Sequence, residues 1–574
     1  MEVSKVWRNG TMKLHTRNVK SCDSMVSGAA SDSNPGANRG GRRPLRILVY
    51  LSVMEKACIH LAVVLLLLQQ MSTCLSIVNI TTDQTALLVL QSQISLYNPH
   101  SVLARNWSTS TPVCSWIGVT CSLRHQRITA LNLSSMNLKG MVPPQLGNLS
   151  FLISLDIRNN NFHGTLPEEL AHLRRLKMIN AMNNNFTGAI PSFFGLLPNL
   201  HSLYLSFNQF AGNIPLSLFN ITKLKYLRLR GNFLGGEIPQ EISSLCCLNL
   251  IDLQDNKLTG SIPPTIFNQS SLKQIGLTKN ILYGKLPRNI CDNLPNLEVL
   301  GLSSNRFDDL IPPNLQNCSK LQILSLSVND FSGTIPASEI PRELGYLQRL
   351  QLFGLYQNRL SLFNSSKPFQ HFNPPNLDNC GLLTVLDLSN NILSGSIPDS
   401  LGNLEFLVVL QIGLNKLIYQ NPSSQLTFLT SLTRCRNLRE LVIARNPLND
   451  ILPVSIGNFS SSLQIFSAPG CKLRGIIPEE IGNLTNVLWI SLFANDLTGF
   501  IPKTVRGLQK LQRILIQSNM ISGTIPDEIC YLQNLGDLIV GRNKISGPLP
   551  SCLGNVTTLR NLYLASKQVE LQLT

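Results

Sequence analysis

The stretch LHSLYLSFNQFAGNIPLSLFNITKLKYLRLRGNFLGGEIP, from Leu200 to Pro239, contains two copies of one pattern, L-x-x-L-x-L-x-x-N-x-L-x-G-x-I-P. The pattern recurs along most of the chain. Its asparagine position can be followed from Met136 to Lys567, and 12 of the 17 successive spacings are 24 residues. A fixed period of this length is typical of a solenoid, in which each repeat is one coil that packs against its neighbours.

Each coil predicts the same local structures. The segment x-x-L-x-L-x-x alternates with period two, which predicts a short strand with inward leucines, and stacked strands would form a parallel sheet on the concave face. The asparagine after the strand can bond backbone groups in the turn, so successive asparagines would form a ladder. A later segment such as Pro167 to Leu176 predicts a helical or 3-10 turn on the convex side. We therefore predict an α/β solenoid, a right-handed leucine-rich-repeat superhelix of about 18 repeats with an N-terminal helical cap.

Composition and motifs disfavour several functional classes. The net charge is +16, but only 14% of residues are charged and the solenoid has no Lys/Arg block interleaved with aromatic residues. Nucleic-acid binding is therefore not expected, although anionic cell-wall polymers fit the charge. No phosphate-binding glycine loop, HExxH motif or nucleophile elbow occurs. We expect no enzyme activity, cofactor or metal, and a paired-carboxylate hydrolase site on the concave face is kept as an alternative.

The N-terminal part divides into three segments. Residues 1–53 are rich in Ser, Gly, Asn and Arg and predict a disordered extension. Residues 54–76 have a basic residue, a ten-residue apolar run and small residues before Ser76, which predicts a secretory signal peptide; a signal anchor with a cytosolic basic tail is the alternative. Residues 77–127 predict the cap and 128–574 the solenoid, which we expect to be C-terminally truncated because its last coil stops without a cap.

The cap has its own pattern. Thr82 and Asp83 are expected to open a helix with an apolar face, and Trp107 and Trp116 to cover the leucines of the first coil. Cys114 and Cys121 bracket a short loop before the first repeat and predict a disulfide bond.

The other cysteines fall at repeat positions. We expect burial without bonding at one recurrent position, and a buried thiol where cysteine replaces the marker asparagine. A second pair lies one coil apart and can bond. The residues concerned are Cys318, Cys380 and Cys435 for the recurrent position, Cys471 for the replacement, and Cys530 with Cys552 for the pair.

N-x-[ST] sequons agree with secretion, because several recur as G-N-L-[ST] at one outward position of the repeat. Asn132 lies in the first predicted strand and is expected to stay unmodified. The sequons predicted to carry glycans are Asn79, Asn106, Asn148, Asn185, Asn220, Asn268, Asn317, Asn364, Asn458, Asn483 and Asn555.

Several segments resemble the extracellular part of plant leucine-rich-repeat receptor kinases. The cap segments TDQTALLVLQSQI and NWSTSTPVCSWIGVTC, together with NLRELVIARNPLNDILPVSIGN and CKLRGIIPEEIGNLTN, are similar to the subfamily containing the flagellin and elongation-factor-Tu receptors and the rice bacterial-blight resistance receptor. The resemblance covers about Asp83 to Leu564. It implies a peptide or protein ligand on the concave face, a co-receptor kinase ectodomain as partner, and an immune or developmental signal passed to a cytoplasmic Ser/Thr kinase.

This chain departs from that pattern because it contains neither a 20-residue apolar span nor a kinase sequence after the repeats. A membrane link through a missing C-terminal span is therefore expected, and signalling by this polypeptide alone is not. The leading interpretation is a receptor ectodomain at the extracellular face of the plasma membrane or in the apoplast. The alternatives are a secreted inhibitor of cell-wall-degrading enzymes and a structural or decoy protein without signalling.

Candidate ligand-binding residues follow from the register of the repeat. Outward strand positions that combine aromatic residues with arginine have the composition of binding hot spots. Tyr204, Arg228 and Asp252 are expected to lie side by side, and pairing of Arg228 with Asp252 on a generic solvated face is the alternative. The first patch comprises Met182, Tyr204, Phe207, Tyr226, Arg228, Arg230 and Asp252, and the second comprises Trp489, Phe493 and Arg513.

Overall fold

The computed structural model describes residues 80–564, except 98, 313, 314, 316, 336–346, 363–380 and 420–424. All of them lie in one compact unit, Val78–Thr574. The predictions for residues 1–53 and 54–76, for the sequons Asn79 and Asn364, and for Cys380 and Lys567 lie outside the described residues.

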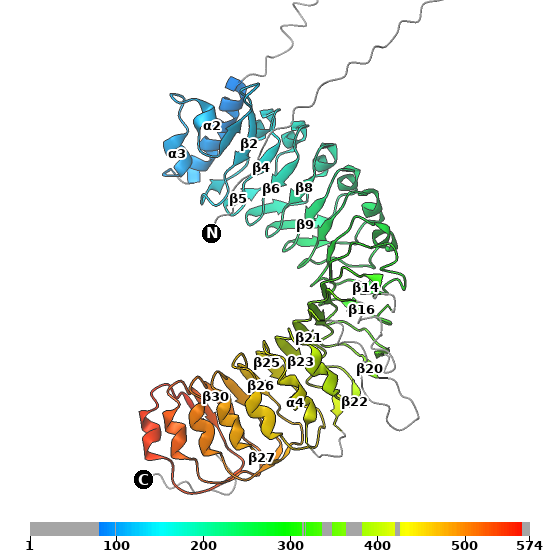
Figure 1. The fold of residues 1–574 in the computed structure, drawn as a ribbon. Coiled ribbons are helices and arrows are strands. Elements are labelled where there is room, and N and C mark those ends of the chain that lie inside the picture. The colour runs from blue at the N-terminus through cyan, green and yellow to red at the C-terminus, as the bar shows by residue number, and fades with distance from the viewer. Residues whose placement is uncertain are drawn as a thin grey trace, which may run out of the picture. The chain divides into compact units, whose positions relative to one another are not determined.

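The described residues form one long sheet of 19 strands whose order in space follows the chain (Figure 1). Neighbouring strands are parallel, except that β1 and β2 are antiparallel. The predicted parallel sheet of stacked repeats is thus confirmed. The strands are β1 (Val119–Cys121), β2 (Ile128–Asn132), β4 (Ser154–Asp156), β6 (Met178–Asn180), β8 (Ser202–Tyr204), β10 (Tyr226–Arg228), β12 (Leu250–Asp252), β13 (Gln274–Gly276), β15 (Val299–Gly301), β17 (Ile323–Ser325), β19 (Leu352–Gly354), β21 (Val385–Asp387), β23 (Val409–Gln411), β25 (Glu440–Val442), β26 (Ile465–Ser467), β28 (Trp489–Ser491), β30 (Arg513–Leu515), β32 (Asp537–Ile539) and β34 (Asn561–Tyr563).

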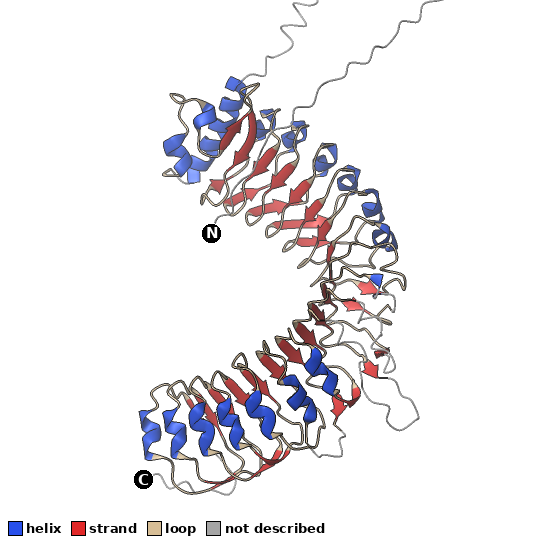
Figure 2. Ribbon diagram, in the orientation of Figure 1, coloured by secondary structure: helices blue, strands red, loops and turns tan. Residues whose placement is uncertain are grey.

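Helical turns cover the side of the stack opposite the long sheet (Figure 2). Most follow the proline of the repeat, whose fixed φ starts the turn. The predicted turn within Pro167 to Leu176 is a 3-10 helix. The helical elements of the coils are η2 (Pro144–Asn148), η3 (Glu168–His172), η4 (Ser192–Leu196), η5 (Leu216–Asn220), η6 (Gln240–Ser244), η7 (Pro264–Asn268), η11 (Asp399–Asn403), α4 (Thr427–Leu432), η12 (Val454–Asn458), η13 (Glu479–Asn483), η14 (Lys503–Gly507), η15 (Asp527–Tyr531) and η16 (Ser551–Asn555).

In most coils a short strand lies between the strand of the long sheet and the helical turn, and these short strands form small parallel sheets along one lateral edge. The largest has five strands, and the others are pairs. Its strands are β3 (Lys139–Gly140), β5 (Asn161–Gly164), β7 (Asn185–Gly188), β9 (Gln209–Asn213) and β11 (Phe233–Gly235); the pairs are β14 (Tyr283–Gly284) with β16 (Arg306–Phe307), β18 (Thr334–Ile335) with β20 (Ser361–Leu362), β22 (Ser394–Ser396) with β24 (Lys416–Ile418), β27 (Arg474–Ile476) with β29 (Asp496–Thr498), and β31 (Ser522–Gly523) with β33 (Lys544–Ile545).

The core is a set of columns that run from coil to coil. Leu203 and Leu205 of β8 and its turn are fully buried, as are their counterparts on neighbouring coils. Phe162, Phe186 and Phe210 stack with ring centroids 6.3 and 6.2 Å apart. Because each apolar side chain is covered by the next coil, stacking supplies the stability that one coil lacks.

The marker asparagines form the predicted ladder between coils. Asn208 Nδ2 donates to Ala181 O of the preceding coil at 2.9 Å and to Leu205 O at 3.1 Å. Its Oδ1 accepts the backbone N–H of Phe186, also on the preceding coil, at 3.1 Å. At Cys471 the thiol takes over the donor role towards Ile443 O, and burial raises its pKa to about 12. The buried thiol expected at this position is therefore confirmed.

The residue before each marker adopts a left-handed backbone conformation, which the sequence pattern did not reveal. Phe207 has φ 56° and Val328 has φ 57°, whereas only some coils have glycine there, as at Gly231. A non-glycine residue in this region costs about 1–2 kcal/mol. Hydrogen bonds to the next coil hold the conformation, since Phe207 N donates to Arg230 O at 2.7 Å.

The cap closes the first coil with apolar and charged contacts. Its helices are α2 (Ile80–Tyr97), α3 (Val102–Asn106) and the short η1 (Val113–Ser115). Trp107 and Trp116 are buried as expected and stack with centroids 5.4 Å apart. Asp83 lies inside the first turn of α2, where it forms a buried ion pair with Arg127 at 2.7 Å and accepts the N–H of Ile128. The sequence analysis missed this pair because its residues are 44 positions apart.

Three disulfide bonds are present among the described residues. Cys114 bonds Cys121, and Cys530 bonds Cys552. The expectation that Cys318 is buried without a bond was wrong, because it bonds Cys291 of the preceding coil. Cys435, at the same repeat position, is free and fully buried as expected.

Candidate ligand-binding surface

The long sheet presents two outward side chains per strand, and the pairing register aligns them in columns. Tyr204, Arg228 and Asp252 pair in sequence across β8, β10 and β12. The predicted side-by-side arrangement is therefore present, with a strand spacing of about 5 Å. A second outward column runs through Met178, Ser202 and Tyr226.

The first patch places two arginines against two aromatic rings. The Arg228 guanidinium lies 5.8 Å from the Tyr204 ring centroid, and that of Arg230 lies 5.6 Å from the Phe207 centroid. Phe207 is 43% exposed and Tyr226 is 36% exposed. Aromatic and arginine side chains that are already ordered lose little rotamer freedom when a ligand binds, which favours affinity.

Two polar atoms within this patch are buried but have no hydrogen-bond partner: Arg228 Nε and the hydroxyl of Ser206. Ser206 is only 1% exposed. No ion pair joins Arg228 to Asp252 in the described part of the chain, so the direct pairing assumed by the alternative is not seen, and ligand binding at this face stays a prediction. Buried donors without partners are rare, so they mark a place where an additional polar group would be stabilised.

Asp252 contributes negative charge at the edge of the patch. Burial raises the pKa of its carboxyl group, and the N–H of Gln254, Arg230 and Arg228 each offset part of that increase. The patch therefore combines two cationic side chains with a carboxylate that is only partly stabilised by them.

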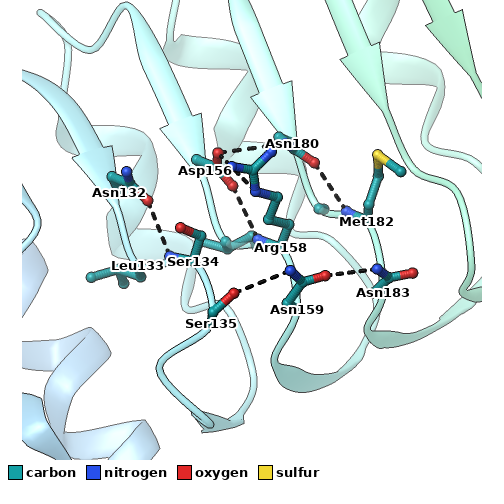
Figure 3. A network of polar contacts seen from close by, with 12 residues as sticks. Asn132, Leu133, Ser134, Ser135, Asp156, Arg158, Asn159, Asn180, Met182 and Asn183 are labelled. Atoms are coloured by element: carbon teal, nitrogen blue, oxygen red, sulfur yellow. Dashed lines mark hydrogen bonds and ion pairs between the residues drawn. The ribbon is translucent and has the colours of Figure 1, made fainter. Parts of the chain in front are cut away.

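The polar residues next to the first patch are satisfied by one another (Figure 3). Asp156 accepts from the amide of Asn180 and from the backbone of Arg158. Along the turn, Asn183 donates to Asn159, and Asn159 donates to the Ser135 hydroxyl. These groups already have hydrogen-bond partners, in contrast to Arg228 Nε and the Ser206 hydroxyl. Along the chain, the first buried polar atoms without a partner among the described residues are therefore those at the first patch.

The second patch is more strongly paired. Trp489 and Arg513 are neighbours across β28 and β30, and the guanidinium lies 5.8 Å from the indole centroid. Arg513 also forms an ion pair with Asp537 at 2.9 Å, a contact that the sequence analysis missed. Phe493 is half-buried on the same face. Trp489 Nε1 is buried without a partner, so this patch too has an unsatisfied donor.

Next to the first patch, one outward column of the sheet consists of small residues. The column that holds Asp252 continues through Gly276, Gly301, Ser325 and Gly354 before it reaches Asp387. The two patches are therefore distinct groups of large side chains on one face of the sheet.

The described sequons leave most of this face unobstructed. Among the described sequons, Asn132 in β2 is the one that lies on a strand of the long sheet. Seven others share one position of the repeat, at the end of the helical turn of their coil. All eight asparagines are exposed. The seven are Asn148, Asn220, Asn268, Asn317, Asn458, Asn483 and Asn555, whereas Asn106 lies in the cap and Asn185 in the lateral sheet.

Among the described residues, no helix combines the length and hydrophobicity required to traverse a bilayer. The same residues contain no cluster of three or more His, Cys, Asp or Glu side chains placed to bind a metal ion.

Two family models match the chain. The leucine rich repeat N-terminal domain matches residues 80–122, and the leucine rich repeat matches residues 151–173, 199–221, 223–245, 247–269, 296–318, 382–404 and 437–459. The LRR receptor-like serine/threonine-protein kinase EFR of Arabidopsis thaliana is 49% identical over 76 residues. This chain is homologous to plant leucine-rich-repeat receptor kinases. The stretch matched in EFR covers 13% of this chain and 7% of that relative.

Solved structures extend the similarity over most of the solenoid. The PEPR1–AtPEP1 structure has a TM-score of 0.64 and 28% identity, covering 85% of this chain and 75% of that one. The Arabidopsis receptor kinase HAESA in complex with the peptide hormone IDA and the co-receptor SERK1 has a TM-score of 0.51 and 28% identity, covering 84% of this chain and 93% of that one. The chain thus resembles ligand-binding receptor ectodomains.

Proposed function

We propose that this chain is the extracellular ligand-binding region of a plant cell-surface receptor and that the first patch binds a secreted peptide or protein. The observation that carries the proposal is the pair of unsatisfied buried groups, Arg228 Nε and Ser206 Oγ, beside the contacts of Arg228 with Tyr204 and of Arg230 with Phe207. A ligand that supplies acceptors to these groups would remove their desolvation cost on binding. The second patch is proposed as an additional contact.

Two further observations support this assignment. The predicted glycans lie away from the patches, so that a macromolecular ligand can approach the sheet. HAESA, which this chain resembles, binds a peptide hormone together with a co-receptor. We extend the proposal to a co-receptor kinase ectodomain as partner and to immune or developmental signalling as the process.

The test uses a matched pair of double variants. Tyr204→Ala with Arg228→Glu removes the centre of the first patch. Tyr283→Ala with Arg306→Glu makes the same changes at an adjacent Tyr and Arg of a lateral sheet, both exposed. The immobilised secreted chain is incubated with the peptide and protein fraction of plant apoplastic fluid, bound molecules are identified by mass spectrometry, and their synthetic or purified forms are titrated by calorimetry.

Affinity should fall by more than about tenfold in the first double variant, since losing hot-spot contacts costs about 2 kcal/mol or more. It should be unchanged in the lateral variant, and both should keep the wild-type melting temperature. Equal affinity of all three proteins would refute the assignment of the patch. Inhibition of a cell-wall-degrading enzyme, with no retained ligand displaced by the first variant, would favour the enzyme-inhibitor alternative.

A further inference from the structure

Two adjacent thiols, Cys246 and Cys247, lie in the segment between η6 and β12, outside the strands of the long sheet. Their sulfur atoms are 4.0 Å apart and unbonded. Cys246 is exposed and Cys247 is half-buried. The other free cysteines of the described residues, Cys435 and Cys471, are fully buried, and burial raises their pKa values to about 11 and about 12. Reagents in solution therefore reach only the adjacent pair among these four thiols.

The rest of the chain has the cysteine chemistry of an oxidising compartment. Three disulfide bonds join six of the ten described cysteines. Two neighbouring thiols in such a compartment meet small disulfides continually. This pair is nevertheless unbonded, whereas cysteine pairs on adjacent coils are bonded.

The geometry of neighbouring residues explains the difference. Adjacent Cα atoms are about 3.8 Å apart, whereas disulfide-bonded residues normally have Cα atoms about 4.4–6.8 Å apart. A bond between neighbours is therefore strained and easily reduced. The local backbone is also anchored, because Leu248 N donates to Leu245 O at 2.9 Å and Ser271 Oγ of the next coil donates to Cys246 O at 3.1 Å. Formation of a disulfide ring between Cys246 and Cys247 would disturb these two hydrogen bonds. The disulfide is therefore not strongly favoured, and both the dithiol and the disulfide remain accessible.

We propose that Cys246 and Cys247 form a reversible dithiol–disulfide pair that exchanges with low-molecular-weight disulfides such as oxidised glutathione. The exposed Cys246 thiolate attacks one sulfur of the small disulfide, forming a mixed disulfide and releasing one small thiolate. The Cys247 thiolate then attacks the Cys246 sulfur, closes the ring and releases the second small thiolate. The protein loses two electrons and two thiol protons, and the small disulfide is reduced to two thiols.

The electrostatic surroundings are consistent with this order of attack. The hydrogen bond with the Cys246 thiol and then partial burial raise the pKa of Cys247, and Lys225 lowers it to a smaller extent. A mixed disulfide at Cys246 removes the hydrogen bond that contributes most to raising the pKa of Cys247, which favours attack by Cys247 in the second step.

The position of the pair favours a small reagent over another protein. Sequons on the coils either side, Asn220 and Asn268, occupy the helical turns that flank this segment. Cys246 Sγ lies 4.0 Å from the backbone oxygen of Thr222, which belongs to the first of these sequons. Glycans at both sequons would restrict a protein-sized partner, whereas a tripeptide such as glutathione would still reach the sulfur.

The experiment uses the whole secreted chain in its native state. It is equilibrated in buffers of graded reduced-to-oxidised glutathione ratio, quenched by alkylation and digested with trypsin. The fragment from Gly231 to Lys257 contains both cysteines and no sequon, so its mass distinguishes alkylated dithiol, ring disulfide and glutathione adduct. Cys246→Ser and Cys247→Ser are analysed in parallel, and a non-reducing gel monitors disulfide-linked dimers.

In the wild type, the fraction of fragment lighter by two hydrogens should rise as the buffer becomes more oxidising and fall again on reversal. Cys247→Ser lacks the resolving thiol and should accumulate at least about tenfold more glutathione adduct than the wild type, whereas Cys246→Ser lacks the attacking thiol and should accumulate less adduct than Cys247→Ser. Complete alkylation of both thiols at every ratio would overturn the proposal. So would an adduct as abundant in the wild type as in Cys247→Ser, or capture of the thiols in a dimer.

Discussion

Replacing Asn208 with alanine tests the main polar connection between coils. Asn208 is 7% exposed and bonds three carbonyl groups, those of Ala181, Leu205 and Ser206, and one N–H group. The carbonyls of Ala181 and Leu205 each keep another asparagine donor, from Asn184 and Asn232 respectively. The N–H of Phe186 loses the acceptor that Asn208 supplies. The cost is therefore dominated by one buried donor left unsatisfied.

The magnitude follows from these contacts. A buried donor without a partner costs about 1–3 kcal/mol, and loss of the two amide N–H groups that the three carbonyls share adds about 0.5–1.5 kcal/mol for each N–H. We expect the local free energy of opening to fall by about 2–6 kcal/mol. Asn208→Asp should destabilise more at neutral pH, because a buried carboxylate would face both carbonyl oxygens, and acidification should reduce the difference.

Hydrogen exchange followed by mass spectrometry is the suitable assay, because coils of a solenoid open locally. The peptide containing Phe186 should exchange faster in the variant, but its protection should remain several orders of magnitude above that of the unfolded chain. The protection of distant coils should be unchanged. The control is Gln209→Ala, which alters the exposed neighbour. If Asn208→Ala and Gln209→Ala agree within about 0.5 kcal/mol, the ladder is not a major source of cohesion.

Two further predictions concern carboxylates. Asp83→Ala removes the carboxylate that forms the buried ion pair with Arg127, so it should destabilise the cap by about 3–5 kcal/mol, measured as exchange protection of α2; unchanged protection would contradict this account. Asp252→Asn should stabilise the fold at neutral pH, because burial raises the folded-state pKa of Asp252. Ionisation of buried Asp252 lowers the free energy of unfolding of the wild type, and this loss grows as pH rises from the ordinary carboxyl pKa through the raised value. The free energies of unfolding of the two proteins should therefore converge in acid. A constant offset at all pH values would argue against it.

The sequence predicted the architecture because one local pattern is repeated and each copy needs its neighbours. Inward leucines, the asparagine ladder and the register of Tyr204 with Arg228 all follow from the period of 24 residues. Insertions do not disturb the register, since β19 and β21 pair in the same way as neighbours separated by the usual spacing.

Features that depend on distant or non-repeating residues could not be predicted in this way. Cys318 shares its repeat position with Cys435, but only Cys318 has a cysteine, Cys291, within reach on the preceding coil. Asp83 reads as a helix-opening residue, whereas folding brings Arg127 against it. In the candidate surface, the pattern identifies which side chains face outward. It does not reveal that Arg228 Nε is left without an acceptor.

The ladder has a direction that matters for biosynthesis. In the described coils, the marker asparagine caps an N–H group of the coil before it, as Asn208 does for Phe186 and Asn232 does for Phe210. A nascent coil is therefore complete only after the following one has left the ribosome. During synthesis the last coil of the chain would always be incomplete. Coils would therefore be completed one after another from the cap towards the C-terminus, at the rate of translation.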